Sequence, residues 1–358
     1  MVAKMEIDVV IINFNYGSYL SECIESVLGQ SVAPKTIIVV DDGSTDNSVS
    51  IIESYGVRIT AVLQENLGHV AAVNAGFAVS TADACIFLDA DDLLYRDCLK
   101  VVLAAWRPND VKVQFRLDTI DREGRNEEMP FPYFGAGLSP EAVRAESLDS
   151  AWYPWTVSSG SVFCRRFLTD LLPIDRTRVY RSPDGYLSKL SPLFGDVRSL
   201  PQILGAYRVH GSNAWARGKE WSIETALRWL NFEIVLQEEF EKTARMKGIV
   251  LKIPFRPSFQ QLEYRLLAFR FARGRTPFPG DTHFGLAKEC LLSSVRARNS
   301  RLRTRMLWLV WLLLLNVGPK YLLVKIVQHA RGQTGRAGVV RRVLSFARGQ
   351  AEQKSAGI

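Results

Sequence analysis

Short apolar runs alternate with amphipathic stretches over the first hundred residues. The apolar, β-branched runs occupy residues 8–12, 36–40, 58–63 and 84–88. The stretches with helical periodicity between them are 18–28, 46–55 and 69–79. Short strands separated by helices predict a mostly parallel sheet with right-handed crossovers. We therefore expect an α/β fold in which helices cover both faces of the sheet.

The pattern changes after Trp106. Residues 111–117 predict a further strand, and residues 121–124 predict the turn of a hairpin. Residues 221–245 have helical spacing, and later prolines separate more helices. We therefore divide the chain into an α/β domain over 1–220, with halves 1–105 and 106–220, and a helical extension over 221–358.

The two domains carry opposite charge. Residues 1–220 hold 21 Lys+Arg against 28 Asp+Glu, whereas residues 221–358 hold 24 against 9. Between Cys290 and Ala351 there are 12 basic residues and no acidic one. A basic segment of this kind is typical of a surface for nucleic acid or for anionic lipid. The five scattered cysteines form no C-x-x-C pair and fit a reducing cytosol.

Three carboxylates follow the apolar run that ends at Leu88. Asp89 and Asp91 are two residues apart, so on a strand they point to the same side. Burying such acids without partners costs several kcal/mol per charge, by order of magnitude. A hard divalent cation that bridges to a phosphate satisfies this cluster. A solvated loop after a strand is the alternative.

A second acidic cluster, Asp41-Asp42-Gly43-Ser44-Thr45-Asp46, also follows an apolar run. In open α/β sheets, ligands bind beyond the carboxyl ends of the strands, where both clusters are expected. A carboxylate there can accept hydrogen bonds from a base or from ribose hydroxyls, although a capped turn without ligand gives the same pattern. The chain has neither the G-x-G-x-x-G of a dinucleotide-binding fold nor a Walker-type phosphate loop.

Five segments together resemble the family 2 glycosyltransferases, which have the GT-A fold. They are Ile11-Ile12-Asn13-Phe14-Asn15, Ile38-Val39-Val40-Asp41-Asp42-Gly43-Ser44-Thr45-Asp46, Asn66-Leu67-Gly68, Asn74-Ala75-Gly76 and Asp89-Ala90-Asp91-Asp92. The resemblance covers about residues 7–100 and continues more weakly to Asn213. It implies a Rossmann-like sheet whose first half binds a nucleoside-diphosphate sugar.

The resemblance also implies roles for individual residues. Asn13, Asp41 and Asp42 are expected at the nucleoside, with Asn66 on the donor side. Asp89 is expected near the ribose and the metal, and Asp91 is expected to bind Mn²⁺ or Mg²⁺. Where many members have Arg or Lys, this chain has Val73, so one customary donor contact is missing or comes from elsewhere.

The family inverts the anomeric carbon, which requires one general base. Asp184 resembles the family's acceptor-side acid, although Pro183 replaces the first acid of the usual pair. Asp170, Asp175 and Asp196 are rival candidates. His210 resembles the histidine that completes the metal or diphosphate site, and neutral imidazole is a suitable third ligand.

The basic extension contains an apolar run of ten residues, 306–315. A bilayer span needs about 20 apolar residues. We therefore expect residues 296–330 to lie on anionic lipid as an interfacial element, with Trp308 and Trp311 at headgroup depth. A kinked single span and a buried pair of core helices are the alternatives. No nucleic-acid motif accompanies the basic residues, so no nucleic-acid partner is expected.

These expectations combine into a metal-dependent, inverting glycosyltransferase at the cytoplasmic face of a membrane, attached as a peripheral or monotopic protein. Its donor would be a UDP- or dTDP-sugar and its acceptor a glycan or a lipid-linked glycan, as in bacterial polysaccharide biosynthesis. A nucleotidyltransferase with a related sheet and a catalytically inactive sugar-nucleotide-binding scaffold are the alternatives.

Overall fold

The computed structural model describes residues 5–128, 130–132, 138–210, 222–272, 275–296 and 302–317. The chain divides into two compact parts. The first comprises Met1–Val209 and Val235–Ile253, and the second comprises His210–Ile234 and Pro254–Ile358. The boundary predicted between residues 220 and 221 lies outside the described residues.

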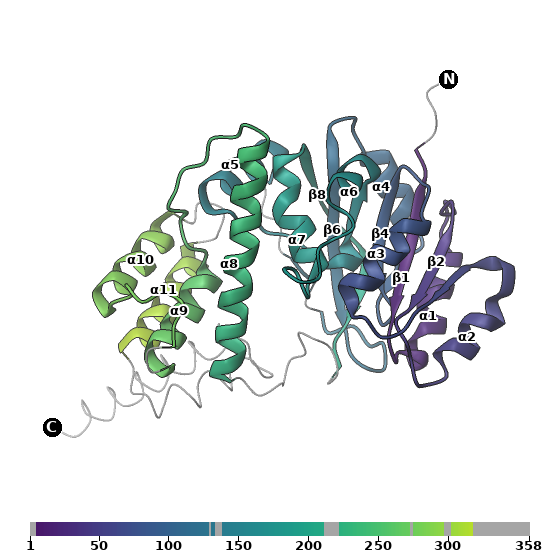
Figure 1. Ribbon diagram of the computed structural model, residues 1–358, viewed down its shortest axis with the longest axis horizontal. Helices are drawn as coiled ribbons and strands as arrows, with labels where there is room; N and C mark the ends of the chain where they lie inside the picture. Colours follow the sequence, from purple (N-terminus) through teal and green to yellow (C-terminus); the bar gives the residue numbers. More distant parts are fainter. Residues whose placement is uncertain are drawn as a thin grey trace. The chain divides into compact units, whose positions relative to one another are not determined.

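Among the described residues of the first part, eight strands form one sheet in the order β3-β2-β1-β4-β7-β6-β8-β5 (Figure 1). The strands are β1 (Ile7–Asn13), β2 (Ile37–Asp41), β3 (Thr60–Leu63), β4 (Ala84–Asp89), β5 (Leu93–Leu94), β6 (Asp110–Ile120), β7 (Ser161–Cys164) and β8 (Asp196–Arg208). The first four strands are all parallel to their neighbours within this group. In the second half, β7 is antiparallel to β4 and β6, β5 is antiparallel to β8, and β6 is parallel to β8. The expected α/β sheet is confirmed, and its parallel part is the first half.

Helices connect these strands and cover the sheet. They are α1 (Gly17–Leu28), α2 (Ser48–Tyr55), α3 (His69–Val79), α4 (Cys98–Ala105), α5 (Pro140–Ser150), α6 (Arg165–Leu171) and α7 (Pro183–Leu190), with 3₁₀ turns η1 (Gly56–Arg58), η2 (Ser158–Gly160) and η3 (Ser191–Leu193). Each helix and strand predicted before residue 90 is present within two residues of its expected bounds. The long strand β6 contains the strand predicted at 111–117.

Strand β1 shows how the sequence builds the two faces. All seven of its residues are buried and five of them are apolar, as expected for a strand that is covered on both faces. Ile7, Val9 and Ile11 pack in one core cluster with residues of α1 and α4. On the other face, Val10 lies against Gly76 of α3. The sheet is therefore a rigid central layer that fixes the positions of its strand ends.

The second part is helical. It contains α9 (Phe259–Phe271), α10 (His283–Arg296) and α11 (Leu302–Val317), while α8 (Ile223–Met246) contributes its first half here and its second half to the first part. Helix α8 confirms the helix predicted at 221–245. No helix among the described residues is long and apolar enough to cross a bilayer.

Helix α11 is packed into protein on one side. Trp311, Leu312 and Leu315 are at most 1% exposed and form a core with α9 and α10. The Trp311 indole N–H donates a hydrogen bond of 3.1 Å to Glu263. The expectation that Trp311 lies at headgroup depth is therefore wrong. The apolar run instead supplies one face of a protein core, which agrees with the alternative of buried core helices. The Trp308 side chain and residues 318–330 lie outside the described residues.

Candidate active site

The parallel strands bring both acidic clusters to one edge of the sheet. In the register of the strands, Asn13 at the end of β1 pairs with Asp41 at the end of β2. On the other side of β1, Ile12 pairs with Asp89 at the end of β4. Since β1 lies between β2 and β4, Asn13 stands between the two acidic clusters.

Asn13 and Asp41 form a buried pair at this edge. The Asn13 amide donates to Asp41 Oδ2 at 2.7 Å and to Ser44 Oγ at 3.1 Å. The Ser44 N–H donates to the other Asp41 oxygen at 2.8 Å. Asn13 Oδ1 is buried and accepts no hydrogen bond from the residues that the structure describes. An unsatisfied buried acceptor is costly, so this oxygen is suited to a ligand that brings an N–H or O–H donor.

Asp42 shapes the loop that follows β3. Its carboxylate accepts hydrogen bonds from the Gln64 amide and from the backbone N–H groups of Leu67 and Gly68, at 2.6–2.9 Å. Asp42 thereby fixes the loop that carries the exposed Asn66 and leads into α3. Gly43 has a φ of +77°, and a Cβ there would stand 2.6 Å from Asn66 N, so glycine permits this close approach.

The cluster at the end of β4 is held by the turn η2. Ser158 Oγ donates to Asp89 Oδ2 at 3.0 Å, and Ser159 Oγ donates to Asp92 Oδ2 at 2.6 Å. Asp89 Oδ1 lies 3.5 Å from His69 Nε2, at the start of α3. The fully buried Asp92 therefore supports the turn.

Arg208, at the end of β8, donates hydrogen bonds to the loop that follows β4. Its backbone N–H donates to Asp92 Oδ1, and its guanidinium Nε donates to the Asp91 carbonyl oxygen, both at 2.9 Å. Nη2 donates to Glu22 Oε2 of α1 at 2.6 Å. Arg208 is only 1% exposed. It supplies buried positive charge beside the acidic loop.

The carboxylates gather around two tyrosines. Burial, followed by the charges of Asp92, Asp89, Asp91 and Asp184, raises the pKa of Tyr207. Burial and the same three loop carboxylates likewise raise the pKa of Tyr16. The phenols therefore stay protonated and offer O–H donors to a ligand at this edge.

The acids themselves are held in a poorly solvated place. Burial raises the pKa of Asp89 to about 6, with His69 opposing the shift and Asp91 and Asp184 adding to it. Burial, together with the charges of Asp91 and Asp89, raises the pKa of Asp92 well above its usual range. The protein thus leaves negative charge here incompletely compensated.

Asp184 reaches this cluster from another element. It lies in the first turn of α7 and accepts a hydrogen bond of 2.8 Å from Ser182 Oγ. With Ser158 and Val73 it lines a narrow cavity that has no room for a water molecule. Its charge acts on both Asp89 and Tyr207. Of the rivals, Asp170 and Asp175 are exposed, and Asp175 accepts hydrogen bonds from Thr177.

The predicted metal site lacks a full protein cage. Among the described residues, no group of three or more His, Cys, Asp or Glu side chains is arranged to hold a metal ion. Mg²⁺ at phosphates commonly uses one or two carboxylates, with phosphate oxygens and water as the other ligands. Asp91, between two acids engaged by serines, fits such an ion as its protein ligand. His210 is buried two residues beyond β8 and begins the second part, so its metal ligation stays a prediction.

Sequence reasoning missed His69, Arg208 and the two serines as members of the site. Arg208 and both serines lie where the resemblance is weaker, and their partners are 67–186 residues away. No spacing rule links residues so far apart. Only the presence of uncompensated acids indicated that a cation was required.

Comparison with known proteins gives a family for the first part of the chain. Residues 8–168 match the model of "Glycosyl transferase family 2". An uncharacterized glycosyltransferase of Nostoc sp. is 35% identical over 216 residues, which are 58% of this chain and 66% of the relative. The glycosyltransferase GlyG of Streptococcus pneumoniae is 35% identical over 111 residues, 30% of this chain and 37% of the relative. The chain thus spans less than two thirds of the length of these relatives.

A solved structure, S. aureus TarS 1–349 in complex with UDP-GlcNAc, has a TM-score of 0.49 and 15% sequence identity, covering 96% of this chain and 92% of that one. The matched family segment contains Asn13, Asp41, Asp89 and Asp91. It includes the parallel strands of the mixed sheet, as expected for a GT-A fold. Residues 8–168 of this chain thus form a glycosyl transferase family 2 domain.

Proposed function

We propose that this chain transfers a sugar from a nucleoside-diphosphate sugar to a hydroxyl group of a glycan or lipid-linked acceptor. The transfer inverts the anomeric carbon and depends on a divalent metal. One observation carries the proposal. Asp89 lies at the same edge of the sheet as the Asn13–Asp41 pair, and after burial the charges of the loop carboxylates and of Asp184 raise the pKa of Tyr207 there. Residues 1–105 bind the donor, and residues 106–220 form the acceptor side.

The nucleoside end of the donor belongs at Asn13 and Asp41. The unsatisfied Asn13 Oδ1 favours a ligand with an N–H or O–H donor, which a uracil or thymine base and a ribose both provide. Asp89 lies one strand away and is suited to a ribose hydroxyl. UDP- and dTDP-sugars are therefore the proposed donors.

Asp184 is the proposed general base. The acceptor oxygen attacks the anomeric carbon while the bond from that carbon to the diphosphate breaks, and Asp184 takes the proton of the attacking hydroxyl. Such a base contributes typically about 10²–10⁴ in rate. When bound, Mn²⁺ or Mg²⁺ on Asp91, with His210 as a proposed further ligand, stabilises the negative charge of the departing diphosphate.

The proposed place of action is the cytoplasmic face of a membrane, where a lipid-linked acceptor is available. Support comes from the 12 basic residues and no acidic one between Cys290 and Ala351. Basic residues near an anionic bilayer each add roughly 1 kcal/mol of attraction. The attachment is peripheral or monotopic.

The test is a donor screen with Mn²⁺ in which release of nucleoside diphosphate is measured. Asp91→Ala should reduce release to background. Asp184→Asn should lower turnover by about 10²-fold or more while donor binding stays within a few-fold of the wild type. Asp170→Asn, an exposed rival, is the matched control and should keep full turnover.

Other outcomes separate the alternatives. Full turnover of Asp184→Asn would refute the assignment of the base. Donor binding without release under any acceptor would favour an inactive binding protein, and release of pyrophosphate from nucleoside triphosphates would favour a nucleotidyltransferase.

A further inference from the structure

Two helices of the second part each expose an apolar stripe. On α10, Phe284 is 81% exposed and Leu291 is 52% exposed. On α11, Met306, Leu313 and Val317 are 54%, 39% and 78% exposed. Residues three to four or seven apart on a helix point to nearly the same side, so each set forms one stripe. We call these five residues together the α10–α11 face.

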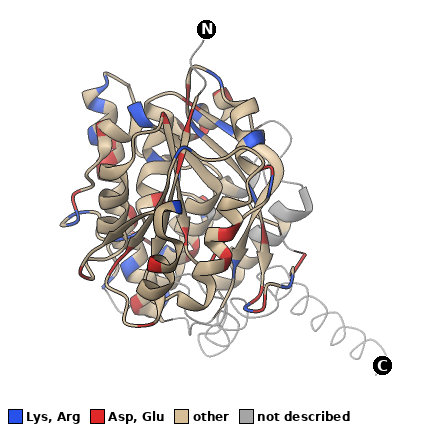
Figure 2. Ribbon diagram, turned by 90° about the vertical axis from the view of Figure 1, so that its right-hand side faces the viewer, with Lys and Arg blue, Asp and Glu red and all other residues tan. Residues whose placement is uncertain are grey.

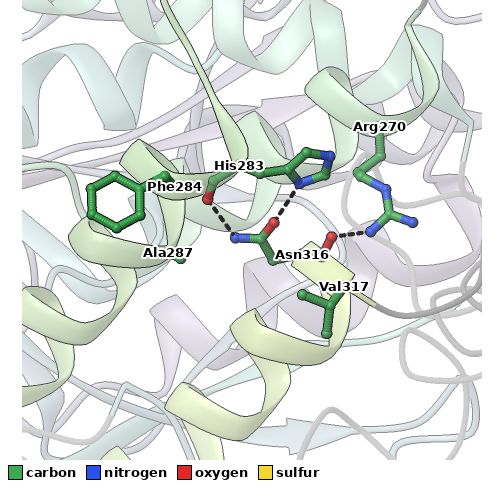
Figure 3. Close-up of a pocket in the computed structure, with 6 residues that line it drawn as sticks. All are labelled: Arg270, His283, Phe284, Ala287, Asn316 and Val317. Carbon is green, nitrogen blue, oxygen red and sulfur yellow. Dashed lines mark hydrogen bonds between the residues drawn. The ribbon is translucent and has the colours of Figure 1, made fainter.

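The two stripes adjoin at one end. Phe284 and Ala287 of α10 and Asn316 and Val317 of α11 line one shallow cavity of about 580 Å³, with Arg270 of α9 at its side (Figure 3). The start of α10 therefore lies beside the end of α11, and Phe284 and Val317 both border one hollow. The apolar surface is continuous across the two helices at this point.

The exposed side chains are not needed to fill the core. The opposite sides of the helices supply that core, through Leu286 and Cys290 of α10 and Trp311 and Leu315 of α11. Asn316 is also satisfied: its amide donates to the His283 carbonyl oxygen at 3.0 Å, and its Oδ1 lies 2.7 Å from His283 Nδ1 (Figure 3). Exposed apolar side chains that gather in this way mark a surface for a partner or a membrane.

The positive charge of this part of the sequence favours an anionic partner. The chain has 12 basic residues and no acidic one between Cys290 and Ala351, a stretch that begins in α10 and contains all of α11. Lys288 is exposed between Phe284 and Leu291. Elsewhere on the described ribbon, basic and acidic residues are interspersed (Figure 2). A second copy docked on this face would bring two basic segments together, and nucleic acid would leave Phe284 and Val317 without an apolar partner.

We propose that the α10–α11 face docks this chain on an anionic lipid bilayer. This inference rests on the proposed membrane attachment. It keeps Met306, Leu313 and Val317 of the segment expected from the sequence and adds Phe284 and Leu291 of α10. Phe284 and Val317 enter the acyl boundary, and the exposed Lys288 of α10 meets the lipid phosphates. The net positive charge of the sequence between Cys290 and Ala351 adds attraction to an anionic surface. The tryptophan at position 311 has no part in it.

The test uses the full chain and vesicles of phosphatidylcholine with phosphatidylglycerol, compared with phosphatidylcholine alone. Wild type should co-sediment with the anionic vesicles. The double variant Phe284→Ser, Val317→Ser should bind them at least about tenfold more weakly, because two inserted apolar side chains are lost. Leu291→Ser with Leu313→Ser should act in the same direction.

The matched control is Val57→Ser with Val250→Ser, which changes two apolar side chains of the first part that are 104% and 90% exposed. It should bind vesicles as the wild type does. All variants change exposed residues, so circular dichroism and binding of UDP with Mn²⁺ should be unchanged. These two measurements separate docking from folding and from the proposed glycosyl transfer.

Each remaining result decides a different point. If the wild type does not bind anionic vesicles, both the proposed membrane attachment and the docking role of the α10–α11 face are wrong. If the wild type and the variants of the α10–α11 face bind the vesicles equally well, the membrane attachment stands but this face is not its docking surface. Variants that keep vesicle binding but turn a dimer into a monomer would show that a second copy occupies the face instead.

Discussion

Lys112 stands in an unusual place for a lysine. It lies in the middle of the sheet on β6 and is completely buried. Its Nζ donates to Ser188 Oγ at 2.7 Å and to the Tyr153 hydroxyl at 3.4 Å. Burial lowers the pKa of Lys112 well below its usual value, although the charge of Asp184 opposes the shift. Since Ser188 lies on α7 with Asp184, this lysine also helps to hold the helix of the proposed base.

We predict that Lys112 makes the free energy of unfolding depend on pH. Its native pKa is below that of the unfolded chain, so between these two values the unfolded chain binds the extra proton and stability rises with pH. Between the two pKa values this contribution is up to about 1.4 kcal/mol per pH unit. Urea unfolding at several pH values should show that slope in the wild type and its loss in Lys112→Met. Equal slopes in both proteins would refute a neutral Lys112.

At this scale the sequence revealed the residues that sit on predictable strands. Asn13, Asp41 and Asp89 fall at strand ends that apolar runs define, so their meeting followed from the topology of a parallel sheet. His69 and Arg208 could not be found in this way. Their partners come from segments far away in the chain, and neither residue stands in a pattern that a helix or strand imposes.

Helix α3 lies unusually close to the sheet. A Cβ at Gly76 would stand 2.3 Å from Val10 Cγ1 and 3.1 Å from Val40 Cγ2. The helix also carries His69 at its first position and Val73 beside the cavity of Asp184. The glycine therefore sets how near these side chains come to the strand ends.

We predict that Gly76→Ala lowers the free energy of unfolding by about 1–3 kcal/mol, because the added methyl group overpacks the core. Helix propensity alone would predict a gain of about 1 kcal/mol. In a Val10→Ala background the methyl group has room, so Gly76→Ala should cost at least about 0.5 kcal/mol less there. A stabilising Gly76→Ala in the wild-type background would contradict this packing.

Helix α11 shows the limit of pattern reading for an element. Ten consecutive apolar residues have apolar side chains on every side, so the sequence could not tell which side meets protein. The structure places Trp311 in the core and Leu313 at the surface. That division depends on packing against α9 and α10. Glu263 of α9, which accepts the Trp311 hydrogen bond, is 48 residues away in the sequence.

For the molecule as a whole, the helical second part depends on α11. We predict that a chain ending at Val295 loses the core contributions of Trp311, Leu312 and Leu315, each worth about 1.5–3 kcal/mol when fully buried. It should bind a hydrophobic dye and aggregate on mild heating. A chain ending at Val317 keeps every described helix and should do neither. If both chains behaved alike in dye binding and thermal unfolding, α11 would not belong to that core.

The turn η2 links the two halves of the sheet through Ser158 and Ser159, which hold Asp89 and Asp92. A molecule bound on the proposed acceptor side that displaces this turn must also disturb the carboxylates of the proposed donor side. By thermodynamic linkage, the coupling free energy is the same in both directions. Whatever factor an acceptor imposes on donor affinity, the donor imposes on acceptor affinity, so the order in which the two substrates arrive leaves the stability of the ternary complex unchanged.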